Sequence, residues 1–268
     1  MARNKGPIQF EGSLGNIRSY YDKSLKKYIL STKGGANREL IMNNPSFART
    51  RDCMNEFTAC SKWASTFRKS LLCLAHLMFS RFFAGVVKLA KEIQLRDEVG
   101  AFGFRSIEAS KFPSLLNEIN LNQEHPFTGV IRDPISITLR EDKRTARFTM
   151  CGFVPGNGFN WRTPFVKFRF YLVIAQLSDW VWNERERRYC PVVDNLRGLT
   201  RMSVSDWMVK NYEPVDIQMD VSFDEPALSQ PGTTVIVVLG VEMASLEAGG
   251  SVYITPGNGT AGIVGCFS

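Results

Sequence analysis

Apolar and polar residues alternate at the start of the chain. The alternation covers residues 17–21, is interrupted by the polar stretch 22–26, and resumes over 28–32. This period of two, bracketed by glycines on both sides, predicts strands around a turn within residues 7–33. A two-stranded hairpin is only marginally stable alone in water. We therefore expect the hairpin to lie against its own chain or against a neighbouring copy.

The periodicity changes at Asn44 and Pro45, which suit the cap and the first position of a helix. Apolar residues then recur every three or four positions, which predicts one apolar helix face. That face is expected to contain Phe47, Met54, Phe57, Cys60 or Ser61, Ala64, Phe67, Leu71 and Leu74. A bend near Ser80 separates this helix from a second one, which ends at about Arg96.

Residues 97–126 resemble a linker, and from residue 127 the period of two returns. Strands are expected over 135–139, 148–150, 165–177, 189–193, 214–223, 233–244, 251–255 and 260–267, with a short helix near 205–210. The predicted class is α+β: a helical N-terminal region with a basic β-hairpin, followed by an antiparallel β-sandwich. The expected domains are a hairpin arm (1–43), a helical region (44–98), a linker (99–126) and the sandwich (127–268).

The most apolar stretch, residues 71–87, contains His76 and Arg81. An arginine near the centre of a bilayer costs roughly 2.5–3.5 kcal/mol, so a buried helix or helix pair is favoured over a membrane span. The N-terminus has no apolar signal-peptide core, which favours a cytoplasmic location. Six widely spaced cysteines fit reduced thiols, and they offer no zinc-binding spacing.

Positive charge is concentrated in the N-terminal part of the chain. The net charge is +7 in total, but +9 over residues 1–98 and −2 over residues 99–268. A basic module of this kind can face nucleic acid, anionic lipid or an acidic protein surface. Basic residues alternate there with aromatic ones, as phosphate neutralisation and base stacking require. Nucleic-acid binding is therefore the alternative function, although no known nucleic-acid-binding motif is present.

Catalytic signals are weak. His125 lies in a loop and offers the third hypothesis, a hydrolase, but no nucleophile motif accompanies it. Carboxylate pairs such as Asp216 with Asp220 fit a solvated strand face better than an acid–base pair. No phosphate loop or dinucleotide-binding fingerprint occurs. The sequence therefore predicts no catalytic residue, no cofactor and no metal ligand.

One resemblance is specific to the N-terminal region. It rests on Lys5-Gly6, Glu11-Gly12, Gly15-Asn16-Ile17, Tyr20, Lys33-Gly34-Gly35, Arg38, Ile41, Asn44-Pro45, Phe47, Arg49-Thr50-Arg51 and Asn55-Glu56-Phe57. This run resembles the start of a family of uncharacterised Bacteroidota proteins of about 250 residues. The likeness continues more weakly at 153–155 and 239–242, and the chain departs from the family in its apolar 71–87 segment and its many cysteines. The resemblance implies a bacterial source and no particular chemistry.

The leading hypothesis is a non-enzymatic structural subunit that self-assembles into a filament, tube or shell. Its partners are expected to be copies of itself, because a basic hairpin that is unstable alone can meet a neutral-to-acidic face of the next copy. The residues predicted to carry this contact are Ile17, Arg18, Tyr20, Tyr21, Lys26, Lys27 and Tyr28.

Overall fold

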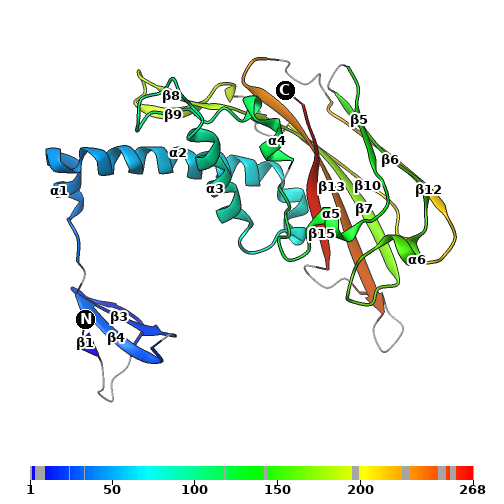
Figure 1. The fold of residues 1–268 in the computed structure, drawn as a ribbon, viewed down its shortest axis with the longest axis horizontal. Helices are drawn as coiled ribbons and strands as arrows, with labels where there is room; N and C mark the ends of the chain where they lie inside the picture. Colours follow the sequence, from blue (N-terminus) through cyan, green and yellow to red (C-terminus); the bar gives the residue numbers. More distant parts are fainter. Residues whose placement is uncertain are drawn as a thin grey trace. The chain divides into compact units, whose positions relative to one another are not determined.

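The computed structural model describes residues 2–3, 10–23, 25–32, 34–117, 119–141, 144–194, 199–224, 230–246, 252–253 and 258–267. The chain forms two compact units, Met1–Arg51 and Asp52–Ser268. Figure 1 shows the helices and strands of each unit. The class is α+β, as predicted: N-terminal strands, a long helix, and then antiparallel sheets.

The N-terminal unit contains a four-stranded antiparallel sheet, which we call the arm sheet. Its strands are β1 (Ala2–Arg3), β2 (Gly12–Leu14), β3 (Ile17–Asp22) and β4 (Lys27–Thr32), in the spatial order β1-β4-β3-β2. The predicted hairpin is its central pair, β3 and β4. Gly15, with φ of +57°, occupies the turn between β2 and β3, where a left-handed backbone is needed. The predicted strand start over residues 7–9 lies outside the described residues.

Two short helices precede the long one. Asn37 caps α1 (Arg38–Asn43) by accepting a hydrogen bond from the Leu40 amide at 2.7 Å. Asn44 caps the 3₁₀ helix η1 (Pro45–Phe47) in the same way, through the Ser46 amide at 2.9 Å. The predicted helix start at Asn44 is therefore confirmed, and α2 (Ala48–Ser70) follows directly.

The buried face of α2 agrees with the predicted one at Cys60, Ala64 and Phe67 but differs from it in the first half of the helix. The buried residues from this helix are Glu56, Ala59, Cys60, Trp63, Ala64 and Phe67. Met54 and Phe57 are instead 48% and 62% exposed, so the expectation that they belong to the core was wrong. Glu56 and Trp63 are buried in place of Met54 and Phe57, on the face that also carries the predicted Phe67.

The helical layer continues through η2 (Leu72–Leu77) and α3 (Phe82–Gln94), with the bend near Ser80 where it was predicted. The segment predicted as a linker contains η3 (Ala109–Lys111) and α4 (Pro113–Leu116). It is paired to strands by two isolated bridges, Ile107 with Trp180 and Asn120 with Gly262. The short helix α5 (Phe127–Val130) follows.

Two antiparallel sheets make up the β-rich part. The large sheet contains β7 (Lys167–Ser178), β10 (Thr200–Val204), β11 (Met208–Val209), β13 (Thr233–Leu246), β14 (Val252–Tyr253) and β15 (Gly259–Phe267). The small sheet contains β5 (Ser136–Leu139), β6 (Thr145–Phe153) and β12 (Val215–Ser222). A separate hairpin pairs β8 (Trp180–Asn183) with β9 (Arg188–Pro191), and the helical turn α6 (Pro155–Gly158) follows β6.

A short helix was predicted near 205–210. These residues are all described by the structure, and they contain the extended strand β11 and no helix. Met208 and Val209 pair with Phe168 and Lys167 of β7, so pairing with an existing strand determines their conformation. The predicted strand over 251–255 lies partly outside the described residues.

Two apolar cores lie on opposite faces of the large sheet. Alternate residues of β7 point to each: Val173 and Ala175 contribute to a core with α2 and α3, whereas Leu172 and Ile174 contribute to a core with β6 and β12. The second unit is therefore a two-sheet sandwich with a helical layer on one outer face (Figure 1). Within the described part of the chain, no helix has both the length and the apolar character needed to cross a membrane.

Candidate functional site

The register of the arm sheet separates its side chains onto two faces. Directly opposed residues share a face, and Ile17 opposes Thr32 and Leu14, while Tyr21 opposes Tyr28. Large apolar and aromatic side chains gather on the face of Ile17. This apolar arm face consists of Leu14, Ile17, Tyr21, Tyr28 and Leu30.

Most of the apolar arm face is open to solvent. Leu14 is 71% exposed, Ile17 45% and Tyr21 41%, and the rings of Tyr21 and Tyr28 meet edge to face at 5.2 Å. Among the described residues of the N-terminal unit, Ile29 is the one hydrophobic side chain that is buried. Such a unit buries too little apolar surface to offset the conformational entropy of ordering it. The apolar arm face is therefore a candidate interface.

The opposite face of the arm sheet, which we call the polar face, carries charged side chains together with Tyr20 and the buried Ile29. It includes Arg18, whose guanidinium lies 5.8 Å from the ring centre of Tyr20, and Lys27. Lys26 is in the β3–β4 turn with φ of +49°. The seven predicted contact residues are thus divided: Ile17, Tyr21 and Tyr28 share the apolar arm face, and the others lie on the polar face or in the turn.

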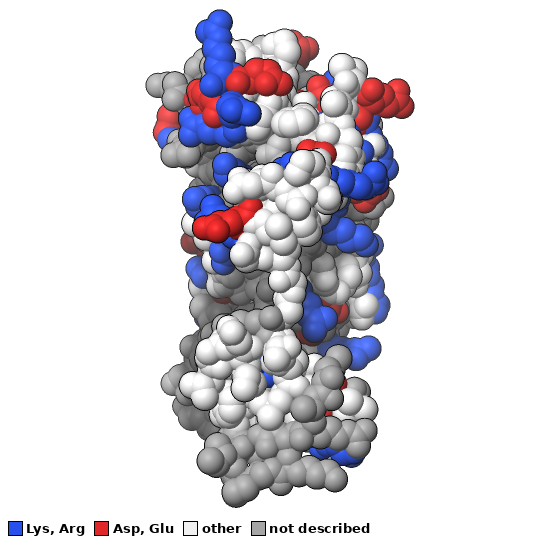
Figure 2. Space-filling view, turned by 90° about the vertical axis from the view of Figure 1, so that its left-hand side faces the viewer, with Lys and Arg blue, Asp and Glu red and all other residues white. Residues whose placement is uncertain are grey.

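Charge of mixed sign covers another exposed hairpin. In the turn between β8 and β9 of the second unit, Glu and Arg alternate over residues 184–187, and acidic and basic side chains lie together at the top of Figure 2. Arg188 there is paired with Glu186. This hairpin therefore lacks the single-signed surface that a phosphate backbone needs.

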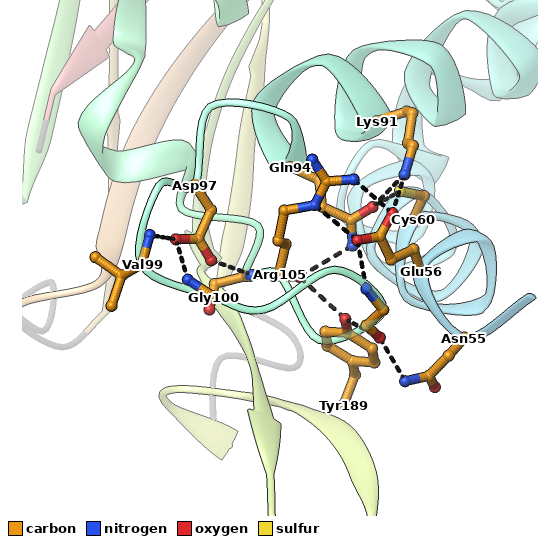
Figure 3. Close-up of polar contacts among 12 residues, drawn as sticks. Asn55, Glu56, Cys60, Lys91, Gln94, Asp97, Val99, Gly100, Arg105 and Tyr189 are labelled. Carbon is orange, nitrogen blue, oxygen red and sulfur yellow. Dashed lines mark hydrogen bonds and ion pairs between the residues drawn. The ribbon is translucent and has the colours of Figure 1, made fainter. Parts of the chain in front are cut away.

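A buried ionic network surrounds Glu56 (Figure 3). Its Oε1 accepts hydrogen bonds from the Gly103 amide at 3.0 Å and from Arg105 Nε at 2.7 Å. Its Oε2 accepts from Arg105 Nη2 at 2.8 Å and from Lys91 Nζ. The network therefore joins α2, α3 and the loop that follows α3.

The donors around Glu56 determine its protonation. Burial alone raises the pKa of this carboxyl, but the hydrogen bonds from Arg105, Lys91 and Gly103 outweigh it and lower the pKa to about 2. With four donors on two oxygens, the carboxylate is saturated and stays ionised at neutral pH. This arrangement suits a structural ion pair and does not suit a general base.

Further contacts hold the loop that supplies Gly103 and Arg105. Asn55 Nδ2 donates to the Gly103 carbonyl at 2.7 Å, and the Tyr189 hydroxyl donates to the Arg105 carbonyl at 3.0 Å. Asp97 Oδ1 accepts from the Val99 and Gly100 amides. The loop is thereby fixed to both α2 and β9.

A second polar cluster lies on the helix-facing side of the large sheet. Glu242 accepts from Arg169 Nε at 2.9 Å and from the Tyr171 hydroxyl at 2.7 Å, and His76 Nε2 lies 3.5 Å from its other oxygen. Burial and the bond to Glu242 raise the pKa of Tyr171. The guanidinium of Arg169 also lies 4.5 Å from the ring centre of Trp207. The buried carboxylate is again paired with a cation.

The residues considered for hydrolysis are not brought together. The ring of His125 packs against Trp161 at 4.6 Å, and no described nucleophile or carboxylate hydrogen-bonds to it. Asp216 accepts from the Gly152 amide, whereas Asp220 is paired with Arg147 at 2.7 Å. Among the described residues, no three His, Cys, Asp or Glu side chains gather in a way that could hold a metal ion.

Sequence reasoning missed the role of Glu56, although a signal was present. Glu56, Cys60, Trp63 and Phe67 recur at spacings of four, three and four, so the glutamate lies on the same helix face as the buried aromatics. A carboxylate at that position must be paired when it is buried. Comparisons of the chain with protein-family models, with curated proteins and with solved structures gave no match.

Proposed function

We propose that the protein is a structural subunit that self-assembles, and that the apolar arm face of one copy is covered by another copy. One observation carries the proposal: the N-terminal unit exposes Leu14, Ile17 and Tyr21 while it buries one hydrophobic side chain among its described residues. Contiguous exposed apolar surface of this kind marks an interaction site. The products expected from repeated contacts are a filament, a tube or a shell.

Charge supports a contact between copies. Residues 1–51 contain ten Lys/Arg and three Asp/Glu, whereas residues 52–268 contain 23 of each. The arm sheets of two copies repel each other, so a contact between two arm sheets is disfavoured. A contact between the arm of one copy and the second unit of another avoids this repulsion. Such a heterologous contact propagates unless it closes into a ring.

Negative-stain microscopy and light scattering of the full chain and of a chain lacking residues 1–35 test the proposal. The truncated chain should remain folded, because both apolar cores draw their residues from Ala59 onward. We expect it to be monomeric, while the full chain forms regular assemblies. A full chain that stays monomeric at high concentration and low salt would refute the proposal, as would a truncated chain that is unfolded or that still assembles.

The alternative function is nucleic-acid binding, favoured by the polar face of the arm sheet. Arg18 and Lys27 share that face with Tyr20, and all three point away from the apolar arm face. Each phosphate contact adds about 0.9 to the slope of log affinity against log salt on duplex DNA. Failure to retain a labelled oligonucleotide at ~50 mM salt, a permissive condition, would dismiss this alternative.

A further inference from the structure

A cleft of about 370 Å³ lies between α3 and the segment that runs from α4 to α5. This volume is within the range of small-molecule sites, ~300–1,000 Å³. Phe82 and Val86, which are buried, and Leu89, Leu115 and Ile119, which are partly buried, form its apolar floor. The floor belongs to the core that α2 and α3 share with the large sheet. The cleft therefore offers an apolar molecule contacts that are continuous with the core.

The wall opposite α3 is held by the large sheet. The Ile263 amide donates to the Ile119 carbonyl at 3.0 Å, and the Leu121 amide donates to the Ala261 carbonyl at 2.8 Å. This stretch of the wall is thereby hydrogen-bonded along β15. A wall that is already in place does not have to be ordered when a ligand binds, which lowers the cost of binding.

Gly85 leaves room in the cleft on its helix side. A Cβ at this position would lie 2.9 Å from Gln123 Nε2, closer than such contacts normally allow. Glycine is a poor residue for the interior of a helix, and Gly85 lies within α3. Its missing side chain allows the Gln123 amide to line the cleft beside the helix.

One cation at the cleft is not compensated. Lys88 and Glu92 line the cleft from the same face of α3, one turn apart. Glu92 is already paired with Arg96 at 3.0 Å, whereas no described acidic side chain pairs with Lys88. The Gln123 amide likewise makes no hydrogen bond to the described residues, and the neighbouring Glu124 does not line the cleft. The lining therefore includes two donors that are open to a ligand.

We propose that this cleft binds a small amphiphilic carboxylate, an acid with an aliphatic body. The aliphatic body lies on the apolar floor, where its burial drives binding. The Lys88 ammonium and the Gln123 amide donate to the carboxylate oxygens. A cationic head in the same place would meet the charge of Lys88 and be repelled. The site lies wholly within the second unit, so it goes beyond the proposed function and does not depend on assembly.

The first experiment compares three ligands that share one aliphatic body. Isothermal titration calorimetry of the full chain measures the binding of octanoate, octanol and octylamine, whose heads are anionic, neutral and cationic at neutral pH. We expect octanoate to bind about two- to fivefold more tightly than octanol, as a partly exposed ion pair provides, and octylamine to bind more weakly than either. Equal affinity for the three ligands would overturn the proposal.

Three single variants locate the ligand. K88Q removes the open cation, and K62Q removes an exposed lysine of α2 that does not line the cleft. K88Q should weaken octanoate binding about two- to fivefold and leave octanol binding unchanged, while K62Q should change neither. G85L fills the cleft and should abolish the binding of both ligands. Leucine is a better helix former than glycine, so α3 itself is not weakened by this change.

Each outcome bears on the proposal. It is overturned if neither octanoate nor octanol shows saturable binding, if K88Q and K62Q bind octanoate equally well, or if a folded G85L still binds it. Circular dichroism identifies a variant that does not fold. If G85L is such a variant, the comparison of K88Q with K62Q decides the question.

Discussion

The double variant L14T/I17T tests the apolar arm face directly. Both residues are at the same cross-strand position of β2 and β3, and threonine is a β-branched residue that strands favour. The exposed fractions of Leu14 and Ile17 together amount to slightly more than one complete side chain. Full burial of one such side chain contributes ~1.5–3 kcal/mol, and threonine retains part of this, so the expected loss is ~1.5–2.5 kcal/mol. This free energy corresponds to a roughly ten- to seventy-fold weaker association.

The folded single chain should tolerate this change. Neither side chain is buried in the N-terminal unit, so the free energy of unfolding should change by less than about 0.5 kcal/mol. Sedimentation velocity over a concentration series measures the association, and urea unfolding measures the stability. The separation of these two effects distinguishes an interface between copies from a core within one chain.

A matched control uses the neighbouring residues of the same two strands. S13T/R18T introduces the same residue type at an adjacent cross-strand pair on the polar face. Its association should stay within about threefold of wild type at physiological salt, where exposed charges are screened beyond ~8 Å. Equal weakening by both double variants would refute the assignment of faces. Unfolding of L14T/I17T alone would show that the apolar arm face is covered within its own chain.

Two further predictions concern buried carboxylates. E56Q should destabilise the fold by about 3 kcal/mol, because it leaves the cations Arg105 and Lys91 without their partner, and urea unfolding measures this loss. Because the pKa of Glu56 falls from 4.5 to about 2 on folding, wild type should lose about 3 kcal/mol as the pH falls from ~5 to ~2, and E56Q should lose less. Burial raises the pKa of Asp179, whose oxygens accept hydrogen bonds from Ser110 and from no other described residue, so its contribution to stability falls as pH rises through that pKa. D179N should therefore equal or exceed wild type in stability at pH 8, with the difference shrinking toward pH 4.

The arrangement of the large sheet could have been predicted more fully. Residues 168–177 and 233–243 are nearly continuous apolar runs, whereas β12 alternates strictly between buried and exposed positions. A continuous run indicates a strand that is covered on both faces, and an alternating strand is covered on one. The sequence therefore contained the information that a helical layer covers the sandwich. What it lacked was the assignment of α2 and α3 to that role, which depends on long-range packing.

The orientation of α2 shows why local periodicity was insufficient. Two helix faces were available, one with Met54 and Phe57 and one with Glu56 and Trp63, and hydrophobicity alone favoured the first. The second was buried because Arg105 and Lys91, which lie 49 and 35 residues away, neutralise Glu56. The spacing of Glu56, Cys60 and Trp63 within the helix indicates that this face can be buried, but it does not identify the cations that pair with Glu56. The cost of burying the carboxylate is offset by partners that only the folded chain brings close.

The arm sheet gives the clearest limit on what sequence can determine. The alternation of residues in the hairpin predicted strands with two faces. Its aromatic and basic residues were nevertheless all assigned to one predicted contact between copies, because they are adjacent in sequence. The register assigns Tyr21 and Tyr28 to one face and Arg18 and Lys27 to the other. Contact with another copy and contact with an anionic polymer would therefore use different sides of the same sheet. Because the two faces alternate residue by residue, single-position variants along β3 separate the two functions: Ile17 and Tyr21 report on assembly, whereas Arg18 reports on anion binding.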